Sequence, residues 1–238
     1  DGSNSGGTDR SLTISNTATT APVGIWISSL GDGAGATNST IKNCVINTNA
    51  ATTATAYGIA VSGATIASAG GDNDNITLQN NAIDSRNTGI YTNGNAAVSA
   101  GGMDNLVVTG NTFYSAGTVL PTYGVQVANA LGASVDANTF NLSTTAGTAP
   151  VAISIEANVS NTTVTRNRVE SLFSSNTGGY GGRGIAVGTG TTNANITIAN
   201  NFIAGVNGSN WTGFGNSSSM GIALGMVGNS TTITTGAA

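Results

Sequence analysis

Two short patterns alternate along the whole chain, and they constrain its fold more than any other feature. The first pattern is apolar-x-x-Asn-x-apolar, as in Leu78–Ile83 and Val108–Phe113. The second is Gly-apolar-x-apolar, as in Gly58–Val61 and Gly124–Val127. Both recur at a similar period of about thirty residues, and such self-similarity is typical of stacked repeats, each of which buries its apolar face against the next.

Within each pattern, apolar and polar residues alternate at period two, which predicts strands with one buried face. No window has a helical stripe, and Ser, Thr, Asn and Gly fill the intervening turns. The repeat length varies while both patterns persist, so the insertions belong to loops at fixed corners of a coil. The sequence therefore predicts an all-β parallel β-helix (β-solenoid) of about seven coils with almost no α-helix. Residues 1–238 form one β-helix segment.

One column of the repeat predicts an internal asparagine ladder. Coils of a parallel stack lie about 4.8 Å apart, so an inward-turned asparagine at a corner can bond to its counterparts above and below and to the turn backbone. Cys44 takes this position in an early coil as a small structural side chain rather than a reactive thiol. Thr17 is the corresponding residue in the first coil. The column comprises Cys44, Asn81, Asn111, Asn138, Asn167 and Asn201.

The composition excludes several kinds of function. Six Lys and Arg against ten Asp and Glu give a net charge of −4, which offers no basic surface for nucleic acid. The chain has no apolar run near the ~20 residues that span a bilayer, so no membrane insertion is expected. With no histidine, Ser-His-Asp chemistry and histidine-based zinc sites are excluded, and the single cysteine cannot form an internal disulfide.

The stacked modules NITLQNNAI…TGIY and NITIANNFI…GIAV resemble the right-handed parallel β-helix of the pectin-lyase-like superfamily. Segments such as DGSNSGGTDRSL and GDNDNI are more closely similar to Gly-, Asn- and Thr-rich β-helix regions of very large secreted or surface proteins of gliding bacteria, exported by the type IX secretion route. This resemblance implies a bacterial protein that is secreted or displayed on the cell surface. Because neither end has a cap pattern, we expect the segment to be excised from a longer chain.

The superfamily includes polysaccharide lyases and hydrolases, which cluster carboxylates on neighbouring coils. Here the outward column three residues after the ladder holds Asp84 and Glu170, which are three coils or about 14 Å apart. An inverting carboxylate pair is separated by only about 6.5–9.5 Å. Arg166 and Arg168 flank Asn167 and have Asp136 one coil below as their expected neighbour, which indicates a surface ion pair. We therefore expect no catalytic residues and no enzymatic activity from this segment.

Asp74 and Asp104 occupy the same register on adjacent coils and are the candidate metal ligands. Stacked carboxylates repel each other unless a cation bridges them, and Ca²⁺ accepts carboxylate, amide and carbonyl oxygens. The alternative is that both are solvated turn residues that bond to their own backbone. The sequence implies no other cofactor.

The longest insertions between the two patterns lie on the last complete coils and contain Tyr180, Arg183, Trp211 and Phe214. Exposed aromatic rings on adjacent loops can stack on sugars while Arg bonds to hydroxyls, which makes these four residues a candidate glycan site. Alternatively, the rings fold back and fix the loops against the solenoid.

These features favour a structural, adhesive segment of a large extracellular protein, with the remainder of the chain and glycans or surfaces as partners. One alternative is a carbohydrate-active enzyme with catalytic coils partly outside the segment. Another is a passive secretion substrate or filament subunit, whose partner is a translocon or a second copy.

Overall fold

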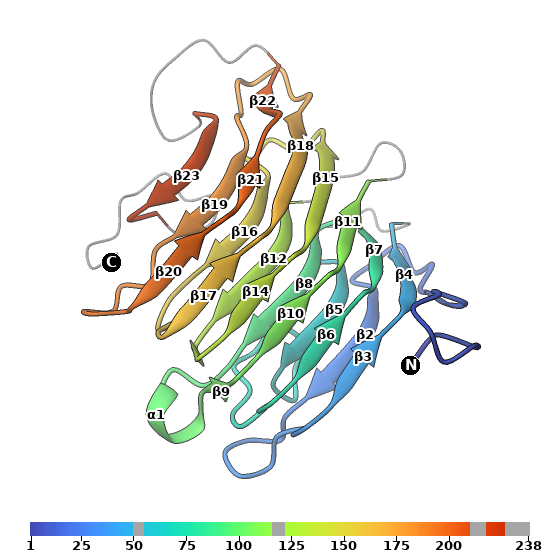
Figure 1. Cartoon of the computed structure of the whole chain (residues 1–238), viewed down its shortest axis with the longest axis vertical. Coiled ribbons are helices and arrows are strands. Elements are labelled where there is room, and N and C mark those ends of the chain that lie inside the picture. The colour runs from blue at the N-terminus through green and yellow to red at the C-terminus, as the bar shows by residue number, and fades with distance from the viewer. Residues whose placement is uncertain (50–54, 116–121, 210–217, 227–238) are drawn as a thin grey trace.

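The computed structural model describes residues 1–49, 55–115, 122–209 and 218–226, and it is an all-β parallel solenoid of about six turns (Figure 1). The predicted fold class is confirmed, and the predicted seven coils are close to the observed number. The one helix within the described residues is the four-residue α1 (Val98–Gly101), and no helix in that part of the chain is long and apolar enough to cross a membrane.

The strands form three long parallel sheets, named here A, B and C. Sheet A contains β1 (Leu12–Ser15), β4 (Cys44–Thr48), β7 (Ala82–Ser85), β11 (Thr112–Tyr114), β15 (Thr139–Thr144), β18 (Arg168–Ser174) and β21 (Phe202–Ile203), with β22 (Val206–Gly208) also paired to β18. Sheet B contains β2 (Val23–Ser28), β5 (Tyr57–Ser62), β8 (Thr88–Asn93), β12 (Tyr123–Ala128), β16 (Val151–Ile155), β19 (Arg183–Val187) and β23 (Met220–Leu224). Sheet C contains β3 (Thr40–Lys42), β6 (Thr77–Gln79), β10 (Val107–Thr109), β14 (Ser134–Asp136), β17 (Thr162–Thr165) and β20 (Ile196–Ala199). The short strands β9 (Met103–Asp104) and β13 (Ala130–Leu131) pair in a corner.

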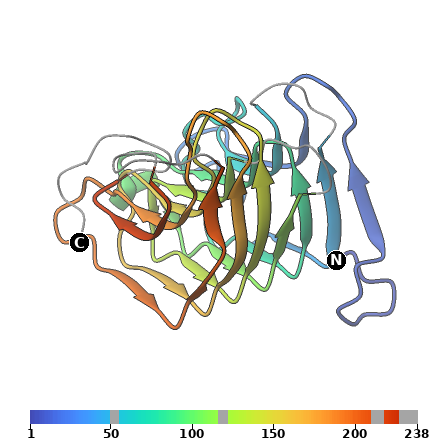
Figure 2. The ribbon, with the colours of Figure 1, turned by 90° about the horizontal axis from the view of Figure 1, so that it is seen from above.

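Each coil passes through sheets C, A and B in turn, and the coils follow one another in chain order (Figure 2). The first sequence pattern spans the end of a sheet C strand, a tight corner and the start of a sheet A strand. The second pattern is the sheet B strand. The two patterns therefore correspond to structural units that recur in register, as in the pairing of Ile59 with Ile90 and of Val125 with Ile153.

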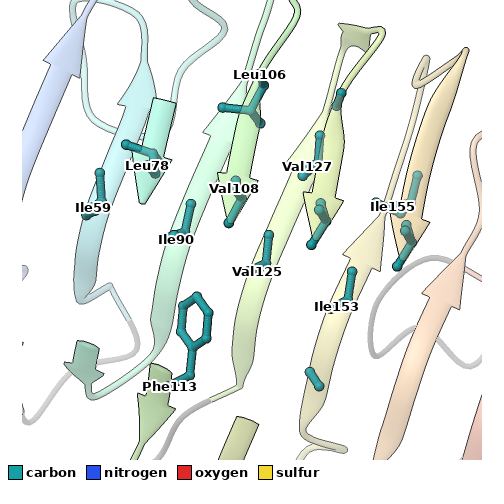
Figure 3. Packing of buried hydrophobic residues seen from close by; sticks show 14 of the residues in the cluster. Ile59, Leu78, Ile90, Leu106, Val108, Phe113, Val125, Val127, Ile153 and Ile155 are labelled. Atoms are coloured by element: carbon teal, nitrogen blue, oxygen red, sulfur yellow. The ribbon is translucent and has the colours of Figure 1, made fainter. Parts of the chain in front are cut away.

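Inward-facing side chains fill the space between the three sheets. Ile59, Ile90, Val125 and Ile153 lie on successive sheet B strands and form a row (Figure 3), and all four are fully buried. Phe113, one coil before Phe140 on sheet A, stacks on it with ring centroids 4.7 Å apart and planes 4° from parallel. Burying a side chain of this size stabilises the fold by about 1.5–3 kcal/mol relative to leaving it exposed.

A column of glycines lets sheet B approach sheet A. A β-carbon at Gly58 would lie 2.6 Å from Ile83 Cγ2 and from the Gly89 carbonyl oxygen, closer than such atoms approach. Gly124 has the same relation to the Phe140 ring and the Ala152 carbonyl oxygen. At Gly58 and Gly124, the glycine of the second pattern is therefore required by the core packing of the next coil, whereas Ala152 takes the same position on β16.

The predicted asparagine ladder is present in the structure. Asn138 is typical: its Oδ1 accepts hydrogen bonds from the backbone N–H (2.9 Å) and side-chain amide (3.0 Å) of Asn111, and its Nδ2 donates to Val108 O (2.9 Å) and Asn167 Oδ1 (3.0 Å). Cys44 takes the predicted place, and its backbone N–H donates to Asn81 Oδ1 at 3.0 Å. Five residues of the ladder are at most 3% exposed, and the partly buried Asn201 continues it. The five are Cys44, Asn81, Asn111, Asn138 and Asn167.

The prediction for Thr17 is wrong. Strand β1 pairs Leu12 with Cys44 and Ile14 with Ile46, so Leu12 occupies the ladder register in the first coil. Gly2 covers Cys44 there: its backbone N–H donates to Lys42 O, its carbonyl oxygen accepts from Leu12 N–H, and a β-carbon on Gly2 would lie 2.9 Å from Cys44 Sγ. The first coil therefore closes the ladder with backbone rather than with an amide.

The residue before each ladder position has a positive φ. These residues are Asn43, Asn80, Gly110, Ala137, Arg166 and Asn200, with φ between 50° and 65°. The left-handed conformation bends the chain so that the next side chain turns inward. Asparagine and glycine tolerate this conformation, which explains the Asn-Asn and Gly-Asn pairs of the first pattern. The alignment of the ladder did not reveal this adjoining column.

Removal of one rung should destabilise the whole solenoid. In Asn138→Ala, the buried backbone N–H of Asn111 loses its acceptor and Val108 O loses a donor, so we expect a loss of about 3 kcal/mol in the free energy of unfolding. Urea unfolding followed by circular dichroism measures this loss. Asn141→Ala, at an exposed position on the same strand, is the control and should change stability by less than about 0.5 kcal/mol. Equal effects of the two substitutions would contradict a structural role for the ladder.

A substitution at the strained corner residue Ala137 should increase the stability of the fold. Ala137 is exposed and has a φ of 53°, a conformation that costs an L-residue with a Cβ roughly 1–2 kcal/mol. Ala137→Asn should therefore raise the free energy of unfolding by about 1 kcal/mol, measured in the same urea titration. The exposed Ala157, whose φ is not positive, serves as control, since Ala157→Asn should give no gain. A destabilised Ala137→Asn variant would contradict the role assigned to the corner.

Candidate functional site

The four residues of the predicted glycan site have different environments. Trp211 and Phe214 lie outside the described residues. Tyr180 is half-buried in the loop before β19, with its ring near Gly147 of the preceding coil, and its carbonyl oxygen leaves no room for a β-carbon on Gly208 of the next coil. The loops of three successive coils thus pack closely on one another around Tyr180.

Arg183 differs from the exposed loop residue that the sequence analysis expected. It is the first residue of β19, pairs with Val151 and Met220 on the neighbouring strands, and is fully buried. Burial lowers the pKa of its guanidinium, an effect that nearby Tyr123 opposes. Because the side chain is enclosed, it cannot bond to a surface ligand in this conformation.

The candidate metal ligands Asp74 and Asp104 lie on adjacent coils, as expected. Asp74 Oδ1 accepts a hydrogen bond from the backbone N–H of Asp104 at 2.9 Å, and Asn75 N–H donates to Asp104 O at 2.8 Å. Burial, followed by the charges of Asp74 and Asp72, raises the pKa of Asp104. Asp74 thus bonds to the turn backbone of the next coil, a contact of the kind expected of a structural turn residue.

Two further aspartates lie in the loops of this corner. Asp72 accepts a hydrogen bond from the backbone N–H of Gly33, and Asp32 accepts one from Asn95 Nδ2 at 2.8 Å. Within the described ranges, no group of three or more His, Cys, Asp or Glu side chains is arranged to hold a metal ion. Calcium binding at Asp74 and Asp104 stays a prediction that rests on two carboxylates.

The carboxylates of the outward column on sheet A do not share one register. The pairing of β15 with β18 shifts after Phe140, so Ser171 rather than Glu170 lies opposite Asn141. Asp84 is only 1% exposed, and its Oδ2 accepts from Asn49 Nδ2 at 2.8 Å. Asp84 and Glu170 therefore differ in register and in burial, in addition to being three coils apart.

Of the two arginines that flank the ladder, Arg166 forms the predicted ion pair with Asp136, whereas Arg168 pairs with Glu170. Arg166 donates to both carboxylate oxygens of Asp136, at 2.9 Å from Nε and 2.5 Å from Nη2, and this lowers the pKa of Asp136. Arg168 bonds to Glu170 at 2.6 Å and lies 4.7 Å from the centre of the Phe202 ring. These exposed pairs join neighbouring coils and neighbouring residues at the surface.

The outer face of sheet B carries an aromatic cluster that the sequence analysis missed. It consists of Trp26, Tyr57 and Tyr91 on β2, β5 and β8. The two tyrosine rings lie 5.1 Å apart at 52°, and Trp26 is 40% exposed with its Nε1 donating to Ser62 Oγ at 3.0 Å. Tyr91 Oη donates to Ala67 O at 3.0 Å, and burial raises the pKa of Tyr91 to about 12.

The column of sheet B that contains Tyr91 continues toward the later coils with polar side chains, of which Ser154 is fully buried. Gln126 pairs in register with Tyr91, and Ser154 with Gln126. Ser154 Oγ donates to Glu156 Oε1 at 2.8 Å, while burial raises the pKa of Glu156. The third position of the second sequence pattern is the signal that could have found this face, since it aligns Trp26, Tyr91, Gln126 and Ser154 in one outward column.

Comparison of the chain with protein-family models, with curated proteins and with solved structures found no match. The β-solenoid fold and the geometry of its surface are therefore the basis for a functional argument.

The acidic corner gives a pH prediction. The folded-state pKa of Asp104 is raised, so the ionised form disfavours folding above that pKa, and its protonation as the pH falls restores stability. Asp104→Asn should therefore melt at a higher temperature than the wild type at pH 7, and this gain should shrink toward pH 4, near the ordinary pKa of aspartate.

Asp9 is the control, because its pKa is lowered whereas that of Asp104 is raised. Its carboxylate accepts hydrogen bonds from Ser11, Ser3 and Ser5, which lower its pKa, so Asp9→Asn should reduce the melting temperature at pH 7. The melts are run with EDTA and with CaCl₂. If Asp104→Asn melts below the wild type in calcium but not in EDTA, the carboxylate corner binds the cation. If Asp104→Asn does not melt above the wild type in EDTA at pH 7, the argument from burial and repulsion fails.

Proposed function

We propose that this segment is a stiff structural element of an extracellular or cell-surface protein, with adhesive contacts made by its lateral surface. The observation that carries the proposal is the stack itself, in which three parallel sheets and an amide ladder pair each coil with the next, with one bulge between β15 and β18. Such a stack resists bending because every coil is bonded to both neighbours by backbone and by side chains.

The composition of the surface supports this role. Only 7% of the residues are charged, and the outward positions of sheet C are mostly threonine, serine and other small polar residues. Polar, weakly charged sides make a spacer that remains hydrated without strong attraction to any one charge. The location outside a bacterial cell, with export by the type IX route, rests on the sequence resemblance alone.

Glycan contact is proposed for the aromatic cluster on sheet B. Trp26 is the most exposed ring of the cluster, Tyr57 and Tyr91 form a tilted pair on the next two strands, and Gln126 lies in the same column as Tyr91. Aromatic faces stack on the apolar faces of sugars while amides and hydroxyls bond to sugar hydroxyls. The loop around Tyr180, together with Trp211 and Phe214, is a second proposed contact region.

A glycan array and a polysaccharide depolymerisation assay test this proposal together. We expect binding without release of product, and a loss of at least tenfold in affinity in Trp26→Ala, since stacking on an exposed ring provides a large part of such binding. The double variant Trp211→Ala, Phe214→Ala tests the loop region separately. Ile66→Ala, another exposed apolar side chain outside the cluster, is the control.

The outcomes separate the alternatives. Product release from an acidic polysaccharide would replace the adhesive proposal with a carbohydrate-active enzyme. Absence of binding in every condition would remove the adhesive part and leave the spacer. Unchanged binding in both variants would reject the proposed contact residues.

A further inference from the structure

The aromatic cluster on sheet B lies next to an edge of the solenoid that carries only negative charge. The segments that connect β2, β5 and β8 to sheet C lie together at this edge (Figure 1), and they contain four aspartates. The three strands and these segments contain no Arg, and their only Lys would be Lys42, which lies beyond them in β3. The four aspartates, named here the acidic corner, are Asp32, Asp72, Asp74 and Asp104.

Hydrogen bonds connect the acidic corner to the exposed ring of the cluster. Ser62, at the end of β5, accepts a bond from Trp26 Nε1 on its Oγ at 3.0 Å. The carbonyl oxygen of Ser62 accepts from Asn73 Nδ2 at 3.1 Å. Asn73 is flanked in the sequence by Asp72 and Asp74. Ser62 and Asn73 therefore link the Trp26 ring to the first carboxylates of the corner.

The carboxylates of the acidic corner have no counter-charge within the described residues. The ion pairs found there do not involve the corner, since their cations are Lys42, Arg166 and Arg168. Asp72 accepts from the Gly33 N–H and Asp32 from Asn95 Nδ2, and both donors are uncharged. Several carboxylates without a nearby cation produce a negative potential at the adjoining surface.

This potential distinguishes between the classes of glycan that aromatic rings can bind. A polysaccharide with carboxylate or sulfate groups would be repelled by the corner, and a neutral one would gain only stacking and hydrogen bonds. A sugar with a protonated amino group would gain attraction to the carboxylates as well. The same ammonium group can also lie over the face of Trp26, which is 40% exposed.

We propose that the glycan bound by the aromatic cluster is a polymer of amino sugars with free, protonated amino groups. The sugar rings stack on Trp26, and the amino groups face the acidic corner. This inference rests on the proposed function, because it names the class of glycan bound at the same cluster. The aromatic rings supply the contact, and the aspartates supply the selectivity.

Calorimetric titration with three probes tests the proposal in a buffer that contains EDTA. Chitosan oligomers carry free amino groups, and fully N-acetylated oligomers of the same length have the same backbone without the charge. We expect the chitosan oligomers to bind at least about tenfold more tightly at low ionic strength. The preference should decrease as salt is added, since salt screens the charges. Polygalacturonate, an anionic polymer, should not bind.

A double variant, Asp32→Asn with Asp72→Asn, identifies the source of the preference. Each asparagine keeps a side-chain oxygen that can accept the bond from Asn95 or Gly33. The variant should bind both oligomers with similar affinity, and its affinity for the acetylated oligomer should equal that of the wild type. The control, Asp136→Asn with Glu170→Gln, removes two charges on another face and should keep the full preference.

Circular dichroism checks that the variants fold, and Asp104→Asn, which is expected to be more stable than the wild type, replaces the double variant if that unfolds. Equal binding of the two oligomers by the wild type would overturn the charge inference and leave the glycan proposal in place. Tighter binding of polygalacturonate would do the same. If Trp26→Ala binds chitosan as well as the wild type does, or if no probe binds, the proposed contact at the cluster fails together with this inference.

Discussion

The structure depends on one requirement: at the corner between sheets C and A, each coil turns a backbone N–H into the protein interior, where it needs an acceptor. The side-chain oxygen of the ladder residue in the next coil supplies that acceptor, as Asn138 does for Asn111 and Asn167 does for Asn138. An unsatisfied buried N–H costs about 1–3 kcal/mol, so the corner specifies an amide at this position. The same amide then bonds to its neighbours and fixes the vertical register of the coils.

Other sequence preferences follow from this corner. The residue before the ladder position must adopt a left-handed conformation, which favours Asn or Gly. Because side chains alternate along a strand, the inward ladder residue then determines which residues of the two flanking strands face the core. Sheet B in turn needs glycine where its backbone meets large side chains of sheet A, as at Gly89 against Phe113. Between these constrained points the chain is free to vary, and loop lengths differ from coil to coil without changing the register.

This division explains what could be predicted from the sequence. The ladder, the strand faces and the nearly complete lack of helix were predictable because each recurs in every coil and has a local physical cause. The position of Leu12 instead of Thr17 in the first coil was not, because Gly2 and the backbone replace the amide there and the repeat pattern is lost.

The candidate sites were less predictable, since they depend on features that occur once. Arg183 was expected in a loop, but it is the first paired residue of β19 and its side chain is fully buried. The pairing register of β15 and β18 shifts at a bulge near Glu170, and the residue spacing of the repeats does not reveal it. Trp26 and Tyr91 fall in one column only when the repeats of the second pattern are aligned as strands of one sheet, because the two residues are far apart along the chain.

The ladder also determines where function can arise in this fold. Residues that maintain the corner, the glycine column or the core are bound by the coil-to-coil geometry and cannot be adapted to a ligand without loss of stability. Exposed outward positions of the strands carry no such constraint, and their side chains are held in columns at the strand spacing of about 4.8 Å. Aromatic residues in those columns, such as Trp26 and Tyr91, therefore form a surface whose spacing is set by the backbone. A stable scaffold with unconstrained outer columns can acquire binding by substitution at its surface, without change to the repeat that folds it.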